Sequence, residues 1–137
     1  MSPQENNKLL VRHFFERAFI DHDLDAAGEL LARDYELHDP ARPVFAGGPA
    51  SFKAAHLGYE EAIEDHQLSV DDQLAEGDKV VTRWTVTGTQ CADLPGIPNR
   101  GRSFLINGIT ISRVKDGHIA EEWQVWDDAG LERQLLS

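Results

Sequence analysis

The chain has 137 residues and one cysteine, Cys91, which fits a single domain over 1–137 whose core needs neither a disulfide nor a metal. A formal net charge of −11 repels nucleic acid and anionic membranes, so neutral or cationic small molecules are the more favourable ligands. The sequence has no apolar run near the roughly 20 residues of a membrane span and no recognisable secretory leader, and both features favour a cytoplasmic location.

The first half of the chain predicts three helices and one short strand. Apolar side chains recur at helical spacing from Leu10 to Ala18, and Asp23 is typical of a residue that caps a helix N-terminus. Asp39-Pro40 closes a short alternating segment, and Pro49 suits the first turn of a helix. The expected elements are, in chain order, helices over 5–20 and 24–31, a strand over 35–39, a loop over 41–48 and a helix that begins at 48.

From His66 onward the apolar residues alternate with period two, which predicts strands. Glu76-Gly77-Asp78-Lys79 and Asp116-Gly117 are typical of hairpin turns. The expected strands begin at 66 and then cover 80–90, 102–115 and 118–127, and a helical turn over 131–136 closes the chain. Helices first and strands afterwards indicate an α+β fold, in which three N-terminal helices pack on one face of a curved antiparallel sheet.

The last predicted strand mixes indoles, carboxylates and an amide where a core strand carries aliphatic residues. Alternation divides its side chains between two faces. One face carries Glu122, Gln124 and Trp126, and the other carries Glu121, Trp123, Val125 and Asp127. This pattern is typical of a strand that lines a ligand cavity with one face and meets a partner with the other.

Several short motifs are spread over nearly the whole chain. They are His38-Asp39-Pro40, Glu76-Gly77-Asp78-Lys79-Val80-Val81, Trp84 before Thr87-Gly88-Thr89, Gly96-Ile97-Pro98, Arg113 before Asp116-Gly117, Ile119-Ala120-Glu121, Trp123, Asp127 and Arg133-Gln134-Leu135. In their order and spacing the chain resembles the SnoaL-like branch of the NTF2-like superfamily, which includes polyketide cyclases and ester cyclase-like proteins.

The resemblance implies an NTF2-like cone, in which a strongly curved antiparallel sheet wraps around helices and encloses an apolar cavity. It also implies a homodimer or higher oligomer built on the outer sheet face. Members of the branch close aromatic polyketide rings without a cofactor, while relatives include isomerases, dehydratases, epoxide hydrolases and pockets without known chemistry. The fold alone therefore does not determine the reaction.

The chain departs from the polyketide cyclases at their acid/base positions. The resemblance places Gln124 where those cyclases have an aspartate on the last strand, and Glu122 and Thr110 where they have histidines. An amide cannot take a proton from carbon at neutral pH, so the cyclase mechanism does not carry over residue by residue. Asp127 matches a position that is common across the wider branch.

The catalytic candidates are Asp127, Glu122 and His38. Neighbouring indoles would raise the pKa of Asp127 by desolvation, whereas the alternative is a structural carboxylate that caps the following turn or pairs with an arginine. Glu122 enters the cavity if its face is inward and is an ordinary solvated charge if that face is outward. His38 suits proton exchange near neutral pH at the mouth of the cone, and its alternative is a hydrogen bond to a loop backbone.

The predicted substrate contacts combine aromatic and polar side chains, as in pockets for flat, largely apolar ligands. They are Gln124, Trp126, Trp84, Asp39, Phe104 and Tyr59. The alternatives are core packing for the aromatic residues and an Asx turn for Asp39. No pair of histidines has the short helical spacing of a zinc site, and no nucleotide- or phosphate-binding motif is present, so we expect neither a metal nor a cofactor.

Together these features predict a SnoaL-like, cofactor-independent acid/base enzyme that cyclises, isomerises, hydrates or dehydrates a small apolar or aromatic carbonyl compound. Asp127 or Glu122 would be the acid/base, His38 would assist, and Gln124 would bond a substrate oxygen. Two alternatives stay open. One is a protein of the same fold that binds a small hydrophobic ligand without transforming it, and the other is a structural dimer with a filled core.

Overall fold

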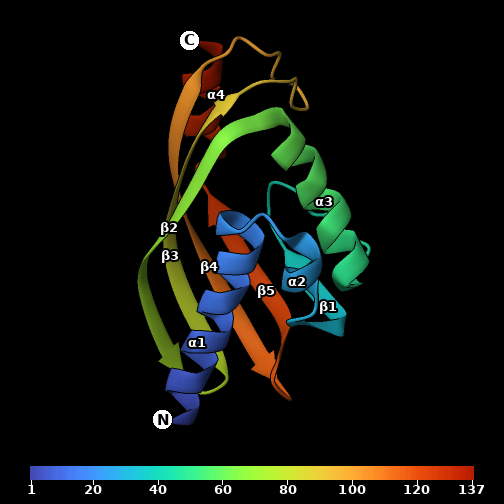
Figure 1. Ribbon diagram of the computed structural model, residues 1–137, viewed down its shortest axis with the longest axis vertical. Helices are drawn as coiled ribbons and strands as arrows, with labels where there is room; N and C mark the ends of the chain where they lie inside the picture. The colour runs from blue at the N-terminus through green and yellow to red at the C-terminus, as the bar shows by residue number, and fades with distance from the viewer.

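A curved five-stranded sheet is the frame of the computed structural model, which describes residues 1–137 (Figure 1). The strands are β1 Leu31–His38, β2 Ile63–Glu76, β3 Lys79–Gln90, β4 Ser103–Lys115 and β5 His118–Trp126. The helices are α1 Pro3–Phe15, a π-helical turn η1 Glu16–Ile20, α2 Leu24–Gly28, α3 Gly48–Ala62 and α4 Asp128–Leu136. Helices α1, α2 and α3 cover one face of the sheet, and α4 lies at the end of the molecule where the chain finishes (Figure 1). The predicted α+β fold is confirmed.

Strands β2 to β5 form an antiparallel meander, and β1 adds to the opposite edge in parallel with β5. The parallel pair was not predicted. It joins segments that are far apart in the chain, with Leu31 beside Ile119 and His38 beside Trp123. Because a parallel pair needs a long connection, α3 and three strands lie between its two members.

Some predicted boundaries were wrong, and in each case pairing or capping explains the difference. Helix α2 ends at Gly28 rather than at 31, because Leu31 is buried and already pairs with Ile119. Strand β2 begins at Ile63 rather than at 66, because Ile63 already pairs with Gln90. The last strand stops at Trp126.

No helix is both long and apolar enough to span a bilayer.

The inner face of the sheet packs against α1 and α3 to form the core. On β3 the side chains of Val80, Thr82, Trp84 and Val86 alternate inward. Gly108 on β4 lies opposite Trp84, and a Cβ atom there would come within 2.2 Å of the indole. The glycine therefore lets the Trp84 ring lie flat against β4, where it becomes part of a cavity wall.

Candidate functional site

A cavity of about 190 Å³ lies between the helices and the inner face of the sheet, and 15 of its 22 lining residues are hydrophobic. Its size is below the roughly 300–1,000 Å³ of pockets that hold drug-sized ligands, so a small guest fits best. Because this space is not filled by side chains, the structure argues against a protein with a completely packed core.

Aromatic rings from several helices and strands form much of the cavity wall. The Phe14 and Phe52 ring centroids are 5.2 Å apart, and the Phe19 and His56 ring centroids are 5.6 Å apart. Trp84 and Trp126 contribute indoles from the sheet side. Close aromatic walls of this kind suit a flat, largely apolar guest.

Asp39 organises the polar end of the cavity. Its carboxylate accepts hydrogen bonds from the Gln124 amide at 3.0 Å, the Arg42 guanidinium at 2.9 Å and the Ala41 backbone N–H at 2.9 Å, with the Trp126 indole N–H at 3.4 Å. Burial alone would raise the pKa of Asp39, but the hydrogen bonds from Gln124, Ala41 and Arg42 outweigh it and hold this pKa below its usual value. The group is therefore an ionised anchor for its neighbours.

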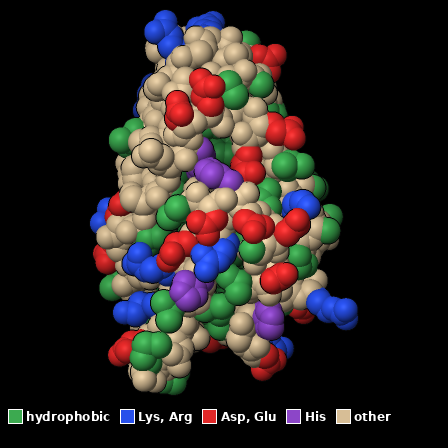
Figure 2. Space-filling view, viewed as in Figure 1, with side chains coloured by type: hydrophobic (Ala, Val, Ile, Leu, Met, Phe, Trp, Pro, Cys, Tyr) green, Lys and Arg blue, Asp and Glu red, His purple; other side chains and the backbone are tan.

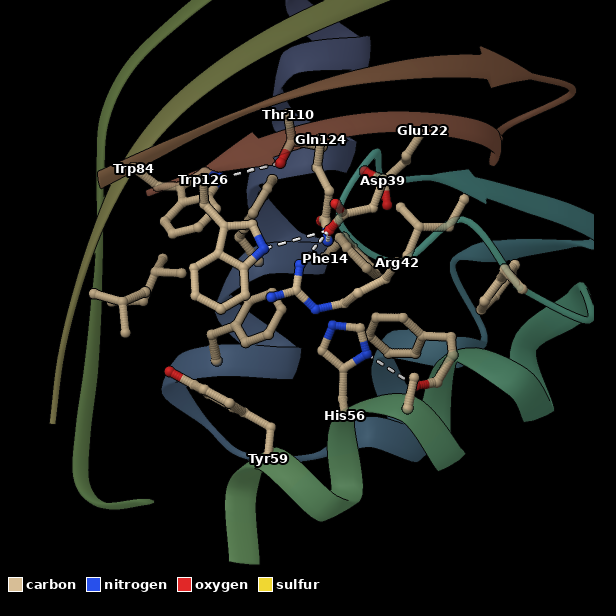
Figure 3. A pocket seen from close by; sticks show the side chains of 18 of the residues that line it. Phe14, Asp39, Arg42, His56, Tyr59, Trp84, Thr110, Glu122, Gln124 and Trp126 are labelled. Atoms are coloured by element: carbon tan, nitrogen blue, oxygen red, sulfur yellow. Dashed lines mark hydrogen bonds and ion pairs between the residues drawn. The ribbon is translucent and has the colours of Figure 1, made fainter. Parts of the chain in front are cut away.

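Asp39 fixes the orientation of two side chains that face the guest space. A carboxylate only accepts hydrogen bonds, so the Gln124 NH₂ group faces Asp39 and the Gln124 Oε1 atom stays available as an acceptor. The Arg42 guanidinium lies 4.2 Å from the centroid of the Trp126 ring (Figure 3), and it also donates a hydrogen bond to Asp128. Arg42 is the one lysine or arginine on the cavity wall.

Glu122 is the most deeply buried acid of the cavity wall. Its side chain is 3% exposed, and it accepts hydrogen bonds from the Tyr35 hydroxyl at 2.7 Å and the Ser112 hydroxyl at 2.5 Å. Burial raises the pKa of Glu122 to about 7, although the bonds from Ser112 and Tyr35 act in the opposite direction. Near neutral pH this carboxyl group is therefore present in both its protonated and its ionised form.

His56 brings a second titratable group into the cavity. Its Nδ1 atom lies 2.9 Å from the Phe52 carbonyl oxygen, so this nitrogen carries the proton and Nε2 keeps its lone pair. Figure 3 shows the ring edge with Nε2 directed into the cavity toward Arg42. Burial lowers the pKa of His56, and the nearby Arg42 charge adds to that effect. The ring is thus a neutral acceptor.

The structure gathers six of the predicted site residues on the cavity wall and leaves three elsewhere. Glu122, Gln124, Trp126, Trp84, Asp39 and Tyr59 line the cavity. Phe104 is buried in the core but does not reach the cavity, and Asp127 is the N-cap of α4, where its Oδ1 atom accepts the Gly130 N–H at 2.8 Å. The expectation that Asp127 acts inside the cavity does not fit this position, which matches its capping alternative.

His38 also lies outside the cavity. His38 and Asp39 are neighbours in an extended segment, so their side chains point to opposite sides of the sheet. With Asp39 inside, the His38 ring stacks on Trp123 of the outer face, with a centroid distance of 5.5 Å. Direct assistance by His38 to a reaction in the cavity does not fit this placement.

Sequence reasoning missed Arg42 and His56 as cavity residues. Arg42 lies in the loop after β1, and no local pattern indicates that such a loop folds back over Trp126. His56 did carry a signal, because Phe52, His56 and Tyr59 have the i, i+4, i+7 spacing of one helix face. That face is the side of α3 that lines the cavity.

Comparison with known proteins agrees with the fold. The family model of SnoaL-like polyketide cyclases matches residues 9–135. Among solved structures, TsrD from Streptomyces laurentii is 32% identical with a TM-score of 0.86, and the match covers 98% of each chain. A proposed polyketide cyclase from Acidithiobacillus ferrooxidans is 26% identical with a TM-score of 0.85, over 99% of this chain and 98% of that one. IdmH, a proposed polyketide cyclase from Streptomyces antibioticus, is 26% identical with a TM-score of 0.81, over 96% and 99%. No curated protein sequence matches the chain.

Proposed function

The chain belongs to the SnoaL-like polyketide cyclase family, and from this premise we propose that it is a cofactor-independent acid/base enzyme. Its substrate would be a small apolar or aromatic molecule that carries a carbonyl group. The aromatic walls and the modest volume of the cavity support a small, flat guest, and the polar end at Asp39 supports a guest with an oxygen function.

The observation that carries the proposal is the state of Glu122. A general acid or base works best when its pKa lies near the working pH, and burial brings the pKa of this carboxyl to about 7. The group also lies on the wall of an apolar cavity, where proton transfer is shielded from bulk water. Among the predicted catalytic residues, only Glu122 combines these two properties.

In the proposed step, the ionised Glu122 carboxylate takes a proton from the carbon beside the substrate carbonyl. The electron pair of the broken C–H bond moves toward the carbonyl oxygen, and the protonated carboxyl then returns the proton to another position of the substrate. Arg42 is suited to the developing negative charge on oxygen, because two of its five N–H groups are accounted for by Asp39 and Asp128. The Gln124 Oε1 atom would accept a hydrogen bond from a substrate hydroxyl.

Two observations favour the alternative of a protein that binds a ligand without transforming it. Gln124 stands where the family resemblance expects the acid/base aspartate, and an amide takes no proton at neutral pH. In addition, both oxygens of Glu122 already accept hydrogen bonds, as a structural carboxyl group would. The two functions make different predictions for Glu122.

The test measures proton exchange at carbon. Aromatic ketones such as 1-tetralone and 1-indanone are incubated with the protein in D₂O, and loss of the hydrogen next to the carbonyl is followed by NMR. We expect the wild-type protein to accelerate exchange and Glu122→Gln to reduce the acceleration by about 100-fold or more. Glu64→Gln, which removes an exposed carboxylate of β2, is the matched control and should exchange like wild type.

Binding is followed in parallel through tryptophan fluorescence, since two indoles line the cavity. Ketones that bind without accelerated exchange would support the binding alternative. Exchange that is equally fast in wild type and Glu122→Gln would remove Glu122 from the mechanism.

A further inference from the structure

Two carboxylates and an imidazole come together on the outer face of the sheet, away from the cavity. The His38 Nε2 atom lies 2.7 Å from the Glu121 Oε2 atom and 3.6 Å from the Glu36 Oε2 atom. One nitrogen or oxygen of each of these residues lies within 4.8 Å of the corresponding atom of the other two. This arrangement is independent of the acid/base function proposed above.

The strand register explains why these residues meet and why the arrangement calls for a cation. Glu36 and His38 are two residues apart on β1, so they share a face, and Glu36 is directly opposite Glu121 in the parallel pair with β5. Two carboxylates at directly opposite positions repel each other and destabilise a sheet. The Arg113 guanidinium already offsets part of this repulsion from the Oε1 side of Glu121, and a positive charge between Glu36 and Glu121 would reduce it further.

Surrounding residues hold the possible ligand atoms in place. The His38 ring stacks on the Trp123 indole with planes 22° apart, which fixes the direction of Nε2. The Arg113 Nε atom donates to the Glu121 Oε1 atom at 3.1 Å, which leaves Oε2 facing His38. Metal-binding carboxylates and imidazoles are commonly oriented by second contacts of this kind.

We propose that Glu36, His38 and Glu121 bind one divalent transition-metal ion, with water in the remaining coordination positions. A ligand set of one imidazole and two carboxylates suits Zn²⁺, Co²⁺, Ni²⁺ or Cu²⁺, whereas Mg²⁺ and Ca²⁺ prefer oxygen ligands alone. Binding replaces any proton on Nε2 by the metal, and this proton passes to solvent. The net charge of −11 further favours the approach of a cation.

A metal at this site would stabilise edge strand β1 next to the polar end of the cavity. Strand β1 pairs only with β5, and its register shifts between Leu31 and Glu36. His38 is its last residue, and Asp39 follows on the inner side as the anchor of Gln124 and Arg42. A metal bridge between β1 and β5 would therefore stabilise the chain segment that carries the polar end of the cavity.

The test uses tag-free, EDTA-treated full-length protein and titration calorimetry with ZnCl₂. We expect one Zn²⁺ per chain, and affinity at least about 10-fold lower in Glu36→Gln and in His38→Gln. His118→Gln removes another exposed histidine of β5 and should bind like wild type. The Glu36 side chain is 64% exposed, so its variant also serves if the His38 variant folds poorly.

A spectroscopic readout places the metal. Cu²⁺ or Ni²⁺ bound at His38 should quench Trp123, and Trp123→Phe should remove most of the quenching. Mg²⁺ at the same concentration should leave both the calorimetric signal and the fluorescence unchanged. Absence of saturable Zn²⁺ binding, or binding that is equally tight in Glu36→Gln and His38→Gln, would overturn the proposal.

Discussion

At the scale of single residues, Glu122 and His66 respond to pH in opposite directions. Burial raises the pKa of Glu122 to about 7 from an ordinary value of 4.5, and burial lowers the pKa of His66 to about 4 from 6.5. Below about pH 4.5 the Glu122 carboxyl is protonated in both the folded and the unfolded chain, and its contribution to the free energy of unfolding is fully present. This contribution is lost as the pH rises through about 7. Neutral His66 makes its full contribution to the free energy of unfolding above about pH 6.5, and this contribution is lost as the pH falls toward 4.

Because these effects oppose each other, a difference between variants reveals Glu122 better than the pH profile of the wild type alone. Glu122→Gln removes the ionisable group, so the wild type should lose stability relative to this variant by about 3 kcal/mol between about pH 4 and pH 8. Urea unfolding at several pH values measures the difference. Glu64→Gln should show no such trend, and a pH-independent difference for Glu122→Gln would mean that the folded-state pKa is not raised.

At the scale of secondary-structure elements, the end of β5 decides the role of Asp127. Alternation correctly separates Glu122 and Gln124 from Glu121 and Trp123, because strand periodicity holds from Glu121 to Trp126, after the irregularity at Ala120. It fails at Asp127, where the strand has ended and the backbone turns into α4. A carboxylate at this position accepts N–H groups of the first helical turn and so stabilises the helix.

The capping role predicts a specific pattern for substitutions at Asp127. Asp127→Ala should lower the free energy of unfolding by about 0.5–2 kcal/mol, whereas Asp127→Asn should cost much less because asparagine is also a good N-cap. Both variants should keep the wild-type rate of ketone exchange. Denaturant unfolding and the NMR exchange assay provide the two measurements, and a strong loss of exchange in Asp127→Asn would return this carboxylate to the catalytic mechanism.

Local patterns predicted the elements well because turns, caps and periodicity are determined by residues that are close together in the sequence. The hairpins at Gly77 and Gly117 and the start of α3 at Gly48 follow such local signals. Local signals do not assign Leu31, since an apolar residue fits either the end of a helix or the start of a strand. Its pairing with Ile119 settles the choice, and that contact depends on residues far along the chain.

The same distinction explains which parts of the site were predictable. The inward face of β5 follows from alternation, so Glu122, Gln124 and Trp126 were placed together from the sequence. Arg42 depends on the path of a loop, and the pairing of His38 with Glu121 depends on a parallel register that no local pattern specifies. The distant contacts thus determine both the polar end of the cavity and the proposed metal site.

At the scale of the whole molecule, charge and apolar surface are distributed differently. Acidic side chains are spread over the face drawn in Figure 2, with basic side chains between them. The outer face of the sheet has an apolar area instead, in which Ile109 is 49% exposed, Val125 is 64% exposed, and the two are directly paired across β4 and β5. Leu105, which is 51% exposed, extends this area along β4. An exposed apolar patch of this kind is typical of an interface.

We propose that a second copy of the chain covers this area, as the family resemblance implies for the outer sheet face. Ile109→Glu places a charge at the centre of the area and should cost about 2 kcal/mol or more of association free energy, which weakens the dimer roughly thirtyfold. Sedimentation across a concentration series measures this change. Leu57→Glu, on the exposed side of α3, replaces a similarly exposed leucine on the helical side and should associate like wild type. A wild-type chain that sediments as a monomer at all concentrations, or an Ile109→Glu variant that dimerises as strongly as Leu57→Glu, would contradict the proposed interface.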